Sequence, residues 1–77
     1  RATFDEVVLA RDSLRFRYSC DHHAGMIVKV PLLERAVSAA TCAGRAVHHR
    51  TRVDFGSKWL YVVLPAGSHH VEVKFKE

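Results

Sequence analysis

The 77-residue sequence contains no asparagine and no glutamine, and isoleucine occurs once. The absence of asparagine excludes an N-glycosylation sequon from this chain. No apolar run approaches the roughly 20 residues that a membrane-spanning helix requires, so we expect no membrane insertion. The basic residues are scattered instead of forming a stripe, and no nucleic-acid-binding motif is present. We therefore expect no nucleic-acid partner.

Apolar residues nevertheless make up 48% of the chain, and the formal net charge is +4 at pH 7. That apolar content is typical of a globular protein and argues against disorder. The length allows one domain, so residues 1–77 are predicted to fold as a single unit. Because so short a domain buries only about 60% of its unfolded surface, its core must be nearly complete or be completed by a neighbour.

Alternation of apolar and polar residues is the main pattern along the chain. In Ser13–Cys20, the side chains of Leu14, Phe16, Tyr18 and Cys20 fall on one face, which predicts a half-buried strand. Further strands are predicted at Phe4–Ala10, Met26–Val30, Arg45–Phe55, Lys58–Leu64 and His69–Phe75. Six or seven short strands at intervals of about ten residues predict an all-β fold, a small antiparallel Ig-like β-sandwich.

The stretch from Pro31 to Gly44 allows two interpretations. Pro31 can begin a helix with Leu32, Leu33, Ala36, Val37 and Ala40 as its apolar stripe, and Gly44 can cap it. Alternatively, Val37–Cys42 is a strand that Ala43-Gly44 turns into the next strand. The strand is the preferred interpretation.

The second half of the chain resembles a known type of module. The runs Val37-Ser38-Ala39, Gly44–Val47 and Trp59–Val73 resemble the C-terminal β-sandwich accessory modules of bacterial extracellular, carbohydrate-active enzymes. Those modules often end with an aromatic strand, a Leu-Pro-Ala-Gly turn and a Val-x-Val-x-Phe strand, as Leu64–Gly67 and Val71–Phe75 do here. Ala43-Gly44 departs from their usual Asn-Gly turn.

The resemblance implies a secreted, non-catalytic accessory or structural module that contacts glycan or a neighbouring domain. Trp59 and Tyr61 share one face of their strand, whereas Leu60, Val62 and Leu64 share the other. If the aliphatic side chains lie inside, the two rings form an exposed platform that can stack on sugar rings or form an interface hot spot. In the preferred interpretation, Trp59 is an ordinary core residue.

Six histidines, arranged as three His-His pairs, raise the hypothesis of a metal-binding module. Adjacent residues on a strand point to opposite faces, so a site needs one histidine from each pair to converge. His22, His48 and His69 are the candidate ligands. In the preferred interpretation the histidines lie at the surface or are partly buried, and no cofactor is bound.

Catalysis is not expected from this sequence. Ser19, Cys20, Asp21 and His22 include residue types found in catalytic triads, but closeness in sequence is not triad geometry. A chain of this size also has little room for a pocket that excludes water. We therefore expect no enzymatic activity.

Cys20 and Cys42 are the two cysteines. A disulfide can join them if Cys42 faces Cys20 across the sandwich, whereas two buried free thiols are the preferred alternative.

The N-terminal segment raises a further functional hypothesis. Ala2–Ala10 precedes Asp12 and can pair with another copy of the chain instead of its own sheet. A short sandwich with an unfilled edge can accept such a strand. A self-assembling extracellular fibre subunit is therefore the second hypothesis, with another copy of the chain as the partner.

Overall fold

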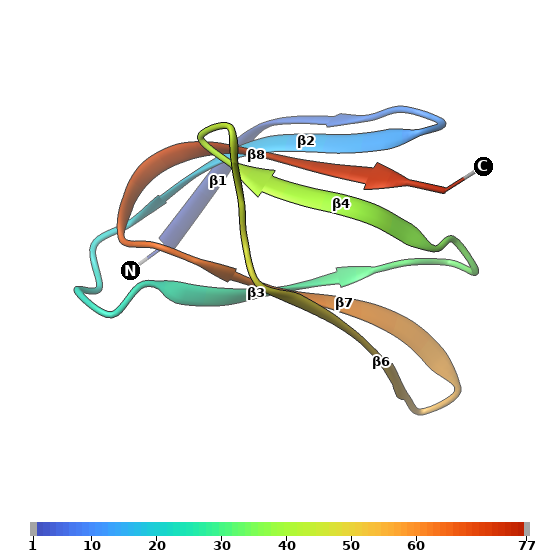
Figure 1. Cartoon of the computed structure of the whole chain (residues 1–77). Coiled ribbons are helices and arrows are strands. Elements are labelled where there is room, and N and C mark those ends of the chain that lie inside the picture. The colour runs from blue at the N-terminus through green and yellow to red at the C-terminus, as the bar shows by residue number, and fades with distance from the viewer. Residues whose placement is uncertain (1, 77) are drawn as a thin grey trace.

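Eight antiparallel strands in two sheets make up the fold in the computed structural model, which describes residues 2–76 (Figure 1). The strands are β1 (Ala2–Leu9), β2 (Ser13–Cys20), β3 (Met26–Pro31), β4 (Val37–Cys42), β5 (Arg45–Ala46), β6 (His49–Asp54), β7 (Ser57–Leu64) and β8 (Gly67–Phe75). One sheet has the order β1-β2-β8-β4-β5 and the other has the order β3-β7-β6. The prediction of an all-β, antiparallel sandwich is confirmed.

The core lies between the two sheets and follows the predicted alternation. Phe16, Tyr18 and Cys20 of β2 are buried, and Arg17 and Ser19 between them are exposed. The five-stranded sheet also buries alternate residues of β4 and β8, and the three-stranded sheet buries alternate residues of β7. The buried apolar side chains are Phe16, Tyr18, Cys20, Val30, Leu32, Ala40, Cys42, Leu60, Val62, Leu64, Val71, Val73 and Phe75.

The stretch Arg45–Phe55, predicted as one strand, is divided between the two sheets. Its first part, β5, pairs with β4, whereas β6 pairs with β7. The change of sheet occurs within one residue, because the Val47 amide donates to the Ala40 carbonyl and the Val63 amide donates to the His48 carbonyl. Figure 1 shows this segment running from one layer to the other. The division raises the number of strands from the predicted six or seven to eight.

The ambiguous stretch Pro31–Gly44 contains strand β4, so the helical alternative is wrong. The connection before β4 is a tight turn, in which the Arg35 amide donates to the Leu32 carbonyl at 3.0 Å. Leu33 and Glu34 occupy its centre with φ of 51° and 71°. The Arg35 guanidinium lies 4.1 Å from the centre of the Phe75 ring, which fixes the turn against the five-stranded sheet.

Two hairpins use two-residue turns in which both central residues have positive φ. These turns are Ala43-Gly44, with φ of 52° and 79°, and Phe55-Gly56, with φ of 53° and 78°. Such turns match the right-handed twist of the flanking strands and favour asparagine at the first position. Because the chain has no asparagine, alanine and phenylalanine occupy that position.

The two cysteines lie on the same sheet and do not face each other across the sandwich. Cys20 is opposite Gly67 and Cys42 is opposite Val71, on either side of β8. Strand spacing then separates their Cα atoms by roughly 15 Å, well beyond the limit of about 7 Å for a disulfide. Both thiols are buried and free, and the Cys42 sulfur lies 3.6 Å from the Tyr18 hydroxyl. The structure therefore has the alternative of two buried thiols.

Candidate functional site

Strand β7 places its aliphatic side chains in the core and its aromatic side chains on the outer face of the three-stranded sheet. Leu60 and Val62 have no exposed surface and Leu64 has 1%, whereas Trp59 and Tyr61 are half-buried and belong to the opposite face. Trp59 is therefore not a core residue, contrary to the preferred interpretation of the sequence. The two rings are available on a surface that the other sheet does not cover.

The strand register determines which residues surround the rings. Arg50 of β6 and Lys29 of β3 lie on either side of Tyr61, and Arg52 and Pro31 lie on either side of Trp59. Because residues at the same level of neighbouring strands project from the same face, these side chains share one surface with the rings. The outer face comprises Ile27, Lys29, Pro31, His48, Arg50, Arg52, Asp54, Trp59, Tyr61 and Val63.

Cationic side chains lie over the aromatic rings of this face. The Lys29 ammonium is 4.3 Å from the centre of the Trp59 ring and 5.7 Å from that of Tyr61. The Arg52 guanidinium is 5.6 Å from the centre of the Tyr61 ring. The negative face of an aromatic ring attracts cations at these distances, by about 0.5–1 kcal/mol at exposed sites. The lysine and the arginine thus hold the rings in place from both edges of the sheet.

Asp54 at the end of β6 links these groups through its carboxylate. The Tyr61 hydroxyl donates a hydrogen bond of 2.6 Å to Asp54 Oδ2, and the Lys29 ammonium lies 3.8 Å from the same oxygen. The hydrogen bond from Tyr61, together with the positive charges of Arg52 and Lys29, lowers the pKa of Asp54 below its ordinary value of 3.8. The carboxylate is therefore ionised across the physiological pH range.

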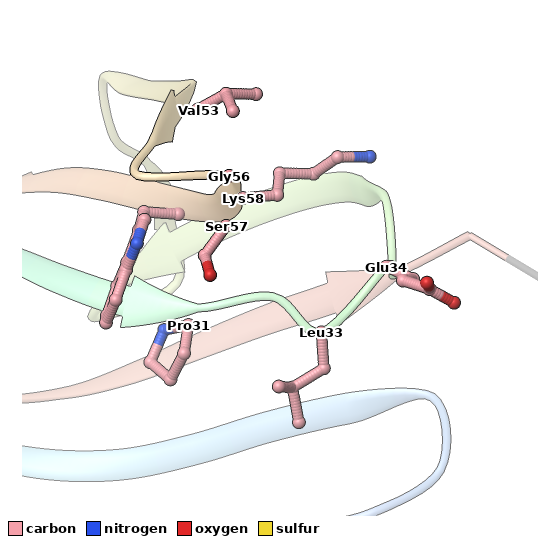
Figure 2. Close-up of a pocket in the computed structure, with 8 residues that line it drawn as sticks. Pro31, Leu33, Glu34, Val53, Gly56, Ser57 and Lys58 are labelled. Carbon is pink, nitrogen blue, oxygen red and sulfur yellow. The ribbon is translucent and has the colours of Figure 1, made fainter.

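Two hollows accompany β7 on this side of the molecule. The first, of about 290 Å³, is lined by Ile27, His48, Arg50, Arg52, Tyr61 and Val63. The second, of about 580 Å³, lies beside Trp59 between the β3–β4 turn and the β6–β7 hairpin. Figure 2 shows its lining: the turn contributes Leu33 and Glu34, and the hairpin contributes Gly56, Ser57 and Lys58. The outer face is therefore an uneven surface with room for ligand groups on both sides of the rings.

The three histidines predicted as metal ligands do not come together. His22 stacks on His23 in the β2–β3 turn, with ring centres 4.8 Å apart. The centre of the His69 ring, on β8, lies 5.9 Å from the centre of the Tyr18 ring, and His69 Nε2 is 3.2 Å from the Ala66 carbonyl oxygen. His48 lines the smaller hollow of the outer face. Within residues 2–76, no three His, Cys, Asp or Glu side chains are grouped so that they can hold a metal ion.

Alternation along the sequence places the two rings on one face but does not predict the charged residues that surround them. Lys29, Arg50, Arg52 and Asp54 come from neighbouring strands, and strand order cannot be read from alternation. One local signal was available, because a two-residue turn at Phe55-Gly56 requires Arg52 to lie opposite Trp59. The position of Lys29 depends on a pairing between β3 and β7, which are distant in the sequence.

Comparison of the chain with protein-family models, with curated proteins and with solved structures found no match. Among residues 2–76 there is no helix that is long and apolar enough to cross a lipid bilayer.

Proposed function

We propose that this chain is a non-catalytic β-sandwich module of a larger extracellular protein, and that it contacts glycan through the outer face of the three-stranded sheet. The observation that carries the proposal is the position of Trp59 and Tyr61 outside the core, with Lys29, Arg52 and Asp54 beside them. Aromatic side chains that lie at the surface beside polar residues are typical of binding sites.

The core does not require these two rings. The aliphatic face of β7 fills the space between the sheets, and its residues Leu60 and Val62 have no exposed surface. The tryptophan on the other face adds apolar surface that contacts water. A ligand that covers this surface would remove it from water. A glycan supplies C–H groups for the apolar surface and hydroxyl groups for the polar side chains around it.

Calorimetry with a panel of soluble polysaccharides tests the proposal. Trp59→Ala is expected to weaken binding about fivefold, because an aromatic contact contributes about 1 kcal/mol. Phe4→Ala serves as the control, since Phe4 is a half-exposed aromatic residue of the other sheet. Equal effects of the two substitutions, or the absence of binding to any polysaccharide, would contradict the proposal.

Assembly by strand addition is a second candidate, favoured by an apolar cleft at the open side of the sandwich. The cleft measures about 280 Å³ and lies between β1 and β3, with Phe4, Val7, Leu14, Phe16, Val28, Val30 and Pro31 among its lining residues. Strand β3 has one neighbour in its sheet, so its other edge has unpaired backbone groups beside this cleft. A strand from a second copy would pair with that edge and cover the apolar lining.

Light scattering on the purified chain distinguishes this candidate. If the cleft mediates assembly, the wild-type chain forms oligomers, and Val7→Glu, which places a charge in the cleft at a 61% exposed position, dissociates them. A wild-type chain that is monomeric over the whole concentration range would exclude assembly.

A further inference from the structure

The outer face has positive charge on both sides of the aromatic strand. Arg50 and Lys29 lie on opposite sides of Tyr61, on strands that are each one hydrogen-bonded neighbour away from β7. Neighbouring strands are about 4.8 Å apart, so the backbones that carry these two cations are separated by roughly 10 Å. Arg52 follows Arg50 by two residues and projects from the same face. Both strands that flank the two rings therefore carry cationic side chains on this face.

The positive charge of the outer face is only partly neutralised. Asp54 is the one acidic residue of the outer face among the described residues, and its carboxylate already interacts with Tyr61, Lys29 and the positive charge of Arg52. Arg50 and Arg52 are exposed, and neither forms an ion pair with a described residue. Two guanidinium groups therefore remain to bind anions, beside the apolar side chains that line the smaller hollow. The planar guanidinium suits carboxylate and sulfate groups.

We propose that the ligand of this face is an acidic polysaccharide, which lies along β7 and places its carboxylate or sulfate groups on Arg50 and Arg52. This inference rests on the proposed function and specifies its ligand class. The smaller hollow brings the two arginines together with Tyr61, Ile27 and Val63, so acidic groups and the C–H surface of a sugar find their partners in one place. A neutral polysaccharide leaves both guanidinium groups unused.

The arrangement of the rings favours a sugar polymer over a single-stranded nucleic acid. Sequence-tolerant nucleic-acid binding depends on bases that stack flat on aromatic rings. Here Lys29 lies over the Trp59 ring and Arg52 lies over the Tyr61 ring, so these side chains compete with a base for the ring faces. A sugar acid can bind through the cations, while its C–H surface contacts the apolar lining of the smaller hollow.

The test compares a double substitution on each sheet of the full chain. Arg50→Ser with Arg52→Ser removes the proposed anion ligands. Arg15→Ser with Arg17→Ser is the matched control, since these two arginines have the same spacing on β2 and are also exposed, on the other sheet. The probes are a polyuronate, a sulfated polysaccharide, a neutral polysaccharide and oligo(dT), each titrated by calorimetry at two salt concentrations. Thermal unfolding checks that both double variants fold.

We expect the chain to bind one or both acidic polysaccharides more tightly at low salt, and the polyuronate and sulfated probes show which acidic group is preferred. The β6 variant should lose about tenfold in affinity, because it lacks two exposed charge pairs with the ligand, while the β2 variant retains most of the affinity. Chemical-shift changes on titrating the wild-type chain should centre on β6 and β7, which tests the site even if the β6 variant does not fold.

Four results would overturn the inference. Equal losses for the two double variants would show that net charge alone is responsible. Tighter binding of oligo(dT) than of either acidic polysaccharide would assign the face to nucleic acid. Binding of the neutral polysaccharide alone, with dependence on Trp59, would refute the acidic ligand but leave the proposed function intact, whereas no binding to any polysaccharide would refute both.

Discussion

Substitution of neighbouring residues on β7 tests which face of this strand belongs to the core. Leu60→Ala removes a side chain with no exposed surface from the middle of the sandwich. Leucine-to-alanine changes in a core cost about 2–5 kcal/mol, because the transfer free energy is lost and a cavity remains. A domain of this length has a total stability of about 4–12 kcal/mol, so the change removes a large part of it. The melting temperature should fall by about 10–30 °C.

Trp59→Ala removes a larger side chain from the outer face and should cost less. Its loss includes the contact with the Lys29 ammonium, which is worth about 0.5–1 kcal/mol at an exposed site. We expect the free energy of unfolding of Leu60→Ala to be lower than that of Trp59→Ala by at least about 1 kcal/mol. Urea unfolding followed by circular dichroism measures both variants. A larger loss for Trp59→Ala would show that the tryptophan faces the core, and the assigned outer face would then be wrong.

Three further predictions concern the turns and the carboxylate of the outer face. Tyr61→Phe removes the hydrogen bond to Asp54, so the lowered pKa of that carboxyl should rise towards 3.8 in an NMR titration, and an unchanged pKa would contradict the contact. Because the wild-type pKa is lowered, Asp54 stabilises the fold above pH 3.8, and this contribution is lost as the pH falls through the lowered value. Phe55→Asn should raise stability by about 1 kcal/mol in thermal unfolding, because the position has a φ of 53° and the ring is fully exposed, and a loss of stability would refute this. Gly25→Ala should destabilise more than Gly44→Ala in the same assay, because both have a φ of 79° but only the first would bring a Cβ against a backbone carbonyl oxygen of β7. Equal losses of stability in the two variants would mean that the positive φ, and not the contact of the added Cβ, sets the cost of the substitution.

The strands of the sandwich could be predicted wherever alternation is continuous and ends at a turn residue. Ser13–Cys20 and Val37–Cys42 have the predicted bounds. The exception is Arg45–Phe55, where alternation continues although the chain changes sheets at Val47 and His48. Alternation shows which side chains share a local face, but it does not show to which sheet a strand belongs. The change of sheet at Val47 and His48 therefore could not be predicted from the pattern.

The candidate site was less predictable because it depends on pairing between distant segments. The sequence could place Trp59 and Tyr61 together, since they lie two residues apart on one strand. It could not decide between inside and outside, because both faces of β7 are apolar and either could fill a core. In the structure the five-stranded sheet covers the aliphatic face of β7, so the two rings lie on the outside. The cationic neighbours then follow from the register with β3 and β6.

The position of the one tryptophan has an optical consequence. Trp59 lies on the outer face, with the Lys29 ammonium 4.3 Å from its ring, while the core contains no other indole. Its ultraviolet emission therefore reports the state of the outer face directly and that of the core only indirectly. A ligand that displaces Lys29 from the ring should change the emission of a fully folded chain, whereas Leu60→Ala should leave the emission of the folded chain nearly unchanged. Fluorescence thus gives a label-free signal in which occupation of this surface and loss of the fold are separable.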